Sequence, residues 1–232
     1  MGKNILIVGG SSGIGLEIAK KLKAKGEHVI TASRHEGELS AYGINHQQYD
    51  VLTDDKIELN VDQLSGMVYC PGSINLRPFN RLKREDFLQD FEINVLGAIK
   101  VVQEVLPLFK KSDTASLVFF STVAVNQGMA YHASVAASKG AIEGLTRSLA
   151  AELAPKIRVN CIAPSIVKTP LAQRLLATPE KEEASAKRHP LQSVGEPEDL
   201  GALAAFLLSQ EARWVTGQIF GVDGGMSSIK MM

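Results

Sequence analysis

Residues 5–15, Ile5-Leu6-Ile7-Val8-Gly9-Gly10-Ser11-Ser12-Gly13-Ile14-Gly15, decide how this chain begins to fold. Four apolar residues in a row, without alternation, predict a strand that is buried on both faces. The glycines that follow predict a tight turn, because glycine adopts positive φ at little cost and lets the backbone approach a ligand closely. A helical pattern starts at Ile14, and the free N–H groups at the start of a helix favour a bound phosphate. The segment therefore predicts a strand–turn–helix unit suited to a dinucleotide.

The same alternation continues along the rest of the chain. Short apolar runs predict strands at Asn4–Gly9, His28–Ser33, His46–Asp50, Gly66–Cys70, Ser116–Ser121, Ile157–Ile162 and Gln218–Val222. Helical periodicity predicts helices at Ile14–Lys25, Arg84–Lys110, Val135–Leu153 and Pro197–Leu208. Strands that alternate with helices predict an α/β fold, a doubly wound, mostly parallel sheet of about seven strands with helices on both faces. No linker or repeat interrupts this pattern, so we expect residues 1–232 to form a single domain.

Composition and charge exclude several classes of function. Twenty-five basic and twenty-five acidic side chains cancel, so no overall field favours nucleic acid or an anionic membrane. Cys70 and Cys161 lie in apolar surroundings and are expected to be buried, reduced thiols, and no spacing suits a metal. No apolar run reaches the ~18 residues of a membrane helix. Only four residues precede the first apolar run, too few for a secretory signal, so we expect a cytoplasmic protein.

The glycine motif and several later motifs resemble the short-chain dehydrogenase/reductase family. The spacing here is G-x-x-x-G-I-G, whereas the general dinucleotide fingerprint is G-x-G-x-x-G. Val8 replaces the threonine that usually precedes the family's first glycine, and Ser165 replaces a usual glycine. Matching motifs then follow in order: Asp50-Val51, Cys70-Pro71-Gly72, Asn94, Arg158–Pro164, Gly217-Gln218 and Val222–Gly225. The resemblance spans essentially the whole chain and implies a Rossmann-like domain that binds a nicotinamide dinucleotide.

The resemblance also implies which residues contact the cofactor. Asp50 and Val51 match the pair that contacts the adenine, and Ile166 and Thr169 match positions that hold the nicotinamide carboxamide. The full set is Gly9, Ser11, Ser12, Gly13, Ile14, Gly15, Ser33, Arg34, Asp50, Val51, Cys70, Pro71, Gly72, Asn94, Lys139, Pro164, Ile166 and Thr169.

The end of the second predicted strand favours NADP(H) over NAD(H). NAD-specific Rossmann proteins usually carry an acidic residue there for the ribose 2′-hydroxyl, whereas a nearby arginine accommodates the 2′-phosphate. This strand ends in Ser33 and Arg34 with no carboxylate. An arginine can form charge-assisted, bidentate hydrogen bonds with a phosphate.

The catalytic motif lacks one of its members. By resemblance, a tyrosine protonates the substrate carbonyl, a lysine one helical turn later lowers the pKa of the tyrosine and binds the ribose, a serine polarises the carbonyl, and an asparagine assists. Lys139 matches the lysine and Asn94 the asparagine, but Val135 stands at the tyrosine position. The serine position falls on Thr122, with Ser121 adjacent. Valine has no proton to give.

Two nearby side chains are candidates for a replacement acid. Tyr131 precedes Lys139 by eight residues, which places it off the face of Lys139 and before the predicted helix. His132 lies seven residues before Lys139, on roughly the same face, and histidine titrates near neutral pH. His132, Tyr131 and a water molecule remain as candidate proton sources.

Three functions are compatible with this sequence. The favoured one is an NADP(H)-dependent oxidoreductase acting on a small carbonyl or alcohol. The alternatives are an NADP-binding sensor or partner subunit without turnover, and a lyase or isomerase on the same scaffold.

Residues 171–189 are expected to cover the substrate cleft as a mobile lid, and the final segment Ser227–Met232 either to join an interface or to be disordered. The resemblance also implies a homodimer or homotetramer formed through Arg84–Lys110 and Val135–Leu153.

Overall fold

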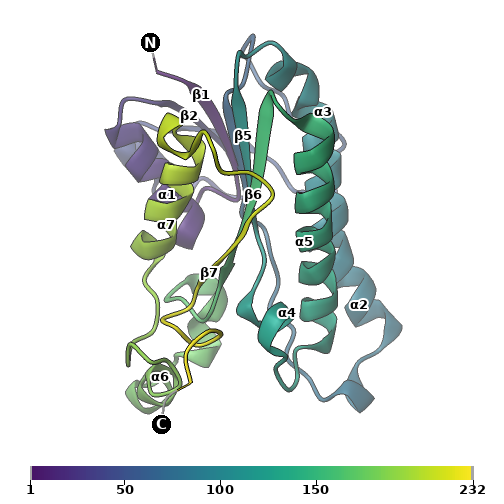
Figure 1. The fold of residues 1–232 in the computed structure, drawn as a ribbon, viewed down its shortest axis with the longest axis vertical. Coiled ribbons are helices and arrows are strands. Elements are labelled where there is room, and N and C mark those ends of the chain that lie inside the picture. Colours follow the sequence, from purple (N-terminus) through teal and green to yellow (C-terminus); the bar gives the residue numbers. More distant parts are fainter. Residues whose placement is uncertain (1, 231–232) are drawn as a thin grey trace.

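The computed structural model describes residues 2–230 and shows a single sheet between two layers of helices (Figure 1). All strand pairs in the sheet are parallel, and the strand order is β3-β2-β1-β4-β5-β6-β7. The strands are β1 (Asn4–Val8), β2 (His28–Ser33), β3 (Asn45–Gln48), β4 (Gly66–Tyr69), β5 (Ala115–Phe120), β6 (Ile157–Pro164) and β7 (Ile219–Val222). This confirms the predicted doubly wound fold, and the sheet is parallel throughout rather than mostly.

Helices on the two faces of the sheet bury two separate apolar clusters. Helices α1 (Gly13–Ala24) and α7 (Pro197–Leu208) cover one face, and α3 (Gly97–Lys110) and α5 (Ala133–Leu153) cover the other (Figure 1). The central strand β5 contributes to both clusters, and all six of its residues are buried. Burying a large apolar side chain contributes about 1.5–3 kcal/mol. The mostly apolar sequence of β5, in which the Ser116 hydroxyl donates to the carbonyl oxygen of Leu207, therefore suits a position with helices on both sides.

Shorter helices connect these layers. They are α2 (Arg84–Phe91), α4 (Val123–Gln127), α6 (Pro179–Ala186) and the 3₁₀ helices Leu39–Tyr42, Phe79–Arg81, Pro170–Leu175 and Gln210–Ala212. The start of α7 follows the predicted pattern, because Pro197 is the first helical residue and the Glu196 N–H donates to Asp199 Oδ2 at 2.9 Å. No helix in residues 2–230 is long and apolar enough to cross a membrane.

The predicted continuous helix Arg84–Lys110 is wrong in one respect. A π-helical turn, Glu92–Leu96, separates α2 from α3 and contains Asn94. The Tyr69 hydroxyl of β4 donates a 2.6 Å hydrogen bond to the carbonyl oxygen of Ile93 inside this turn. A side chain that inserts into the backbone ladder widens a helix locally, and such π turns are frequent at functional sites.

Other differences concern the ends of elements. Strand β6 runs two residues further than predicted, to Pro164, because it pairs with β7 as far as Val222. Strand β3 lies at the edge of the sheet and ends at Gln48, two residues before the predicted end. The segment 171–189, expected to cover the cleft, contains the helix α6. Of the terminal segment, residues 231 and 232 lie outside the described residues.

One lysine joins the segment after β6 to two helices. Lys168 Nζ lies 2.8 Å from Glu182 Oε1 on α6 and 2.7 Å from Glu196 Oε1, which precedes α7. All three side chains are about half exposed. The predicted lid is therefore attached to the body of the domain by ion pairs at the surface.

Candidate active site

Two adjoining cavities lie at the carboxyl edge of the sheet. The larger, about 420 Å³, is lined by the glycine turn after β1, the end of β2 and the segments that follow β3 and β4. The smaller, about 300 Å³, is lined by the ends of β5 and β6, the start of α5 and the segment 171–188. Ile14, Cys70, Gly72, Thr169 and Leu171 border both cavities. In open α/β sheets a ligand binds where the strand order reverses, here between β1 and β4.

The glycine turn leaves room for a phosphate group. A Cβ atom at Gly15 would lie 2.2 Å from the carbonyl oxygen of Gly9, so only glycine fits where α1 crosses the turn, and Gly9 itself has φ +77°. Ser12 precedes α1 in an extended conformation, and its hydroxyl does not cap the helix. The first N–H groups of α1 therefore lack a side-chain cap, as expected of a site that binds a pyrophosphate.

The opposite end of the larger cavity carries an exposed cation. Arg34 borders the cavity, and no carboxylate within residues 2–230 forms an ion pair with it. Ser33 Oγ donates to the carbonyl oxygen of His35 at 2.9 Å, and His46 Nε2 lies 3.1 Å from the same hydroxyl. The Ser33 hydroxyl thus stabilises the turn, and Arg34 remains free to contact an anion. Asp50 and Val51 line the adjacent wall.

Lys139 lies where the two cavities meet. Its side chain is buried, and Nζ donates a 2.9 Å hydrogen bond to the carbonyl oxygen of Phe120 at the end of β5. Burial lowers the pKa of Lys139 to about 8. A lysine with such a pKa exchanges protons readily near neutral pH.

The two cysteines differ in how far they are buried. Cys161 is fully buried, but Cys70 is only half-buried because it borders both cavities. Burial raises the pKa of each thiol to about 12, so both are protonated near neutral pH. The prediction of two buried thiols is therefore wrong for the exposure of Cys70, which a cavity on one side explains.

Asn94 faces Lys139 across Gly72. Its Nδ2 lies 2.7 Å from the carbonyl oxygen of Asp90, 3.0 Å from Ser73 Oγ and 3.2 Å from Ser138 Oγ. Its Oδ1 is buried and has no hydrogen-bond partner within the described residues. A Cβ at Gly72 would lie 3.3 Å from this oxygen and 3.4 Å from Lys139 Nζ. The acceptor and the amine therefore flank the backbone of Gly72, where a cofactor's ribose or a water molecule can bind.

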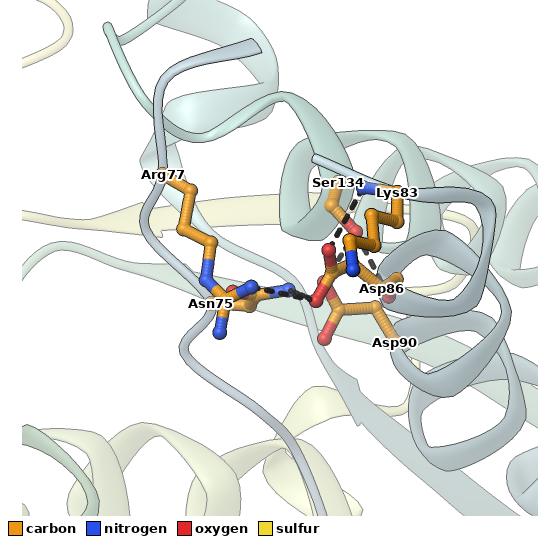
Figure 2. Close-up of polar contacts among 6 residues, drawn as sticks. All are labelled: Asn75, Arg77, Lys83, Asp86, Asp90 and Ser134. Carbon is orange, nitrogen blue, oxygen red and sulfur yellow. Dashed lines mark hydrogen bonds and ion pairs between the residues drawn. The ribbon is translucent and has the colours of Figure 1, made fainter. Parts of the chain in front are cut away.

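A buried carboxylate, which the sequence analysis did not single out, supports this arrangement. Asp90 is 2% exposed and accepts hydrogen bonds from Ser134 Oγ at 2.5 Å and Ser73 Oγ at 2.6 Å. It thereby connects α2 to the first turn of α5 and to the segment after β4, as Figure 2 shows in part. The only sequence signal for it was a carboxylate one helical turn before Asn94.

Asp86, one turn earlier on α2, holds the outer part of the same segment. Its carboxylate accepts from the Lys83 backbone N–H at 2.9 Å and from Asn75 and Arg77, the latter at 3.3 Å (Figure 2). The backbone hydrogen bond of Lys83 is the main cause that lowers the pKa of Asp86. Residues 73–77, which pass beside the smaller cavity, are thus fixed to α2 at two points.

The smaller cavity contains the tyrosine position and the serine position. Val135 is buried in its wall, four residues before Lys139 on α5. Thr122 and Ser121 both line the cavity. Ser121 Oγ donates to Glu143 Oε1 at 2.8 Å and is therefore engaged with α5, whereas Thr122 accepts from the Ala124 N–H as the cap of α4. Thr122 is consequently the better candidate for contact with a substrate.

The two proposed replacement acids differ in position. Tyr131 is 59% exposed and does not line the cavity. His132 immediately precedes α5 and borders the cavity, with its Nδ1 2.8 Å from the carbonyl oxygen of Ala130. Because a carbonyl can only accept, Nδ1 carries the hydrogen and Nε2 of the neutral ring is an acceptor.

The segment after β6 completes the wall. Pro164, Ile166 and Thr169 line the smaller cavity, in the order expected. Ser165 lines it as well, and its hydroxyl lies 2.8 Å from Nε2 of His189. The sequence analysis noted Ser165 only as a replaced glycine and did not single out His189, because the two residues meet only through the folded lid. Residues 2–230 contain no cluster of side chains suited to a metal ion.

Comparisons with known proteins agree with this geometry. Residues 8–227 match the family model described as enoyl-(acyl carrier protein) reductase. The chain is 33% identical to a tropinone reductase homolog of Arabidopsis thaliana, covering 97% of this chain and 92% of the relative. It is 32% identical to the 3-oxoacyl-[acyl-carrier-protein] reductase FabG of Thermotoga maritima, covering 97% and 98%.

Solved structures share the whole fold. The ligand-free aldohexose dehydrogenase of Thermoplasma acidophilum superposes with a TM-score of 0.91 at 27% identity, covering 100% of this chain and 97% of the other. ElxO with NADP bound superposes with a TM-score of 0.90 at 29% identity, covering 99% and 100%. A tyrosine-to-phenylalanine variant of ElxO with NADPH bound gives the same values. The glycine turn, the cavities around Lys139 and these similarities together show that the chain belongs to the short-chain dehydrogenase/reductase family of oxidoreductases.

Proposed function

We propose that this protein is an NADP(H)-dependent oxidoreductase that acts on a small carbonyl or alcohol substrate. One observation carries the proposal: a cavity built for a dinucleotide adjoins a smaller, apolar cavity, and Lys139 lies where they meet. The nicotinamide ring, when bound, supplies or accepts the hydride. The lining of the smaller cavity is largely apolar, which suits a small substrate with few charges.

The preference for NADP(H) rests on Arg34. An unpaired guanidinium at the end of β2 complements a 2′-phosphate, and no carboxylate ends β2 to bind a 2′-hydroxyl. ElxO, which binds NADP and NADPH in its structures, is similar over the full length of this chain. The proposed cofactor contacts are those of the glycine turn, Ser33, Arg34, Asp50, Val51 and the residues from Cys70 to Gly72, with Asn94, Lys139, Pro164, Ile166 and Thr169 beside the nicotinamide half.

The proposed catalytic residues are Lys139, Thr122 and Asn94, with Ser121 behind Thr122. Lys139 binds the ribose and a proton, and Thr122 orients the substrate oxygen. The residue at position 135 cannot donate a proton, and general acid catalysis typically contributes about 10²–10⁴ in rate. Orientation of the reactants contributes several further kcal/mol and does not depend on residue 135. On its position in the sequence alone, His132 is the candidate proton donor.

Val135 also favours a second function, an NADP-binding protein without turnover. The two functions are separated by titrating the purified protein with NADPH and NADH and then assaying aldehydes, ketones, quinones and imines. We expect NADPH to bind more tightly than NADH and at least one carbonyl class to be reduced. Lys139→Ala should abolish this turnover. Tight binding with no turnover across the panel would establish the second function, and failure to bind either cofactor would reject both.

We also propose that the protein forms a homodimer or homotetramer through α3 and α5. The exposed side of α5 carries small residues, and nothing lies within 4 Å of a Cβ placed on Gly144. Small residues let two helices approach closely in an interface. Light scattering should give twice or four times the mass of 25.0 kDa, and Gly144→Arg should shift the protein toward the monomer.

A further inference from the structure

We propose that the hydroxyl of Ser165, supported by His189, exchanges the proton with the substrate oxygen and so replaces the missing tyrosine. This inference rests on the proposed oxidoreductase function and names its proton donor. Ser165 follows β6 directly and lines the smaller cavity together with Val135 and Lys139. His189 follows α6 and lies behind Ser165, with 2% of its surface exposed.

The hydrogen bonds of His189 define its tautomer. Nδ1 lies 2.8 Å from the carbonyl oxygen of Ser185, and Nε2 lies 2.8 Å from Ser165 Oγ. A carbonyl oxygen can only accept, so Nδ1 carries the hydrogen of the neutral ring. Nε2 is then an acceptor, and its only partner among the described residues is the hydroxyl of Ser165. In the neutral state the Ser165 hydroxyl therefore donates to His189.

Protonation of His189 reverses this hydrogen bond. Nε2 then donates to Ser165 Oγ, so the hydroxyl hydrogen of Ser165 stays on the oxygen but no longer bonds to His189. The competing acceptor is Met226 Sδ, at 3.3 Å from Ser165 Oγ, and a thioether is a weak acceptor. The hydrogen can therefore turn toward a substrate oxygen in the cavity that Ser165 and Met226 both line. The pair thus has one state that gives a proton and one that takes it.

The proton balance follows from these two states. In carbonyl reduction the electron pair comes from the reduced nicotinamide cofactor as hydride, and the carbon–oxygen π bond breaks. Ser165 Oγ gives its proton to the substrate oxygen and receives the proton of His189 Nε2, which leaves a neutral ring. In alcohol oxidation the same two protons move in the opposite direction. Solvent protons return through the cavity when it is open.

Ser165 and His189 are better placed than His132. His132 is only half-buried at the rim of the cavity, and its ring bonds to the backbone carbonyl oxygen of Ala130. His189 is enclosed by α6, the end of β6 and the turn after β7. A Cβ on Gly224 in that turn would lie 3.3 Å from the Cβ of His189. α6 carries Glu180, Lys181, Glu182 and Glu183, and Lys187 and Arg188 lie between it and His189. The turn after β7 carries Asp223, whose carboxylate accepts from the N–H groups of Gly225 and Ser227.

The first test measures turnover with a carbonyl substrate in four variants. Ser165→Ala and His189→Gln should each lower kcat by about tenfold or more, within the range of general acid catalysis, with NADPH affinity within about twofold of wild type. His28→Gln, at an exposed histidine at the start of β2, is the matched control and should leave kcat unchanged, whereas His132→Ala tests the alternative donor. The pH profile of kcat should differ between the wild type and His189→Gln. A large loss in His132→Ala, with full activity in Ser165→Ala, would overturn the proposal.

The second test uses the protein without cofactor or substrate. Nitrogen NMR of the imidazole rings, with His189 assigned by its absence in His189→Gln, should show hydrogen on Nδ1 and an accepting Nε2. Ser165→Ala should shift the Nε2 resonance and leave Nδ1 unchanged. Ser165→Gly serves as a second variant in case the alanine protein fails to fold. A ring protonated on Nε2 alone, or an Nε2 resonance indifferent to Ser165, would overturn the relay.

The two proposals fail in different ways. Failure of the wild-type protein to bind NADPH would reject the proposed function itself. Carbonyl turnover that survives both Ser165→Ala and His189→Gln would reject only the proton relay. NADPH binding without any turnover would reject the relay as a catalytic device, together with the oxidoreductase function.

Discussion

The hydroxyl of Tyr69 donates to the carbonyl oxygen of Ile93 at 2.6 Å and thereby stabilises the π-helical turn that presents Asn94. We expect Tyr69→Phe to leave the carbonyl of Ile93, a half-buried residue, without this donor. The loss of one such hydrogen bond typically costs about 0.5–1.5 kcal/mol. Urea unfolding should show a loss of this size, together with weaker NADPH binding if the turn is required. Tyr42→Phe, on an exposed 3₁₀ helix, is the matched control, and an equal loss there would contradict the assignment.

Arg34 should determine which cofactor binds. Arg34→Glu replaces a cation with a carboxylate that repels a 2′-phosphate, so the Kd for NADPH should rise at least about tenfold, or about 1.4 kcal/mol. The Kd for NADH should change much less. Isothermal titration with each cofactor measures both values, and Arg213→Glu, an exposed residue, controls for the charge change. An equal loss for the two cofactors would remove the argument for NADP(H).

Lys139 should make the stability of the cofactor-free protein depend on pH. Its folded pKa of about 8 lies below the unfolded value of 10.5, so the unfolded chain binds more protons between these values. The unfolding free energy should therefore rise by about 2–4 kcal/mol as pH increases from 8 to 10.5. Below pH 8 the folded protein carries the full cost of burying a charged lysine. Lys139→Met should flatten this rise in urea titrations. Persistence of the rise would assign it to another group.

Restoring a tyrosine tests whether a missing proton donor limits the rate. Val135→Tyr places a phenol four residues before Lys139, on the same face of α5, in the wall of the smaller cavity. If donation limits turnover, kcat for ketones should rise, by up to about 10²–10⁴. Val135→Phe, which adds the ring without the hydroxyl, is the control. A gain in both variants would point to packing rather than proton transfer.

Removing Asp90 should loosen the connection between α2 and α5. Asp90→Ala removes the carboxylate that accepts from Ser73 and Ser134, and leaves Ser134 Oγ only its 3.2 Å contact with the carbonyl oxygen of Asp86. A hydrogen bond to a charged group contributes about 1.5–3 kcal/mol. The unfolding midpoint in urea should fall clearly, and Asp90→Asn should recover part of the loss. Asp113→Ala, at an exposed position, should change little. Unchanged stability in Asp90→Ala would show that water replaces the carboxylate.

Local patterns predicted the framework because the strands and the glycine turn are encoded by consecutive residues. The break at Asn94 depends on Tyr69, which lies on another strand, so periodicity within the helix could not show it. The choice between Thr122 and Ser121 was open because successive residues at a strand end face opposite sides, and the hydrogen bond of Ser121 to Glu143 on α5 now favours Thr122. His189 and Ser165 meet only after the segment following β6 folds back over the cavity.

Lys168 gives the covering segment a dependence on ionic strength. Its two pairs with Glu182 and Glu196 are partly exposed, so each contributes at most about 1 kcal/mol and is weakened by added salt. We therefore expect ligands to leave the cavities faster in concentrated salt than in dilute buffer, while the body of the domain is unaffected.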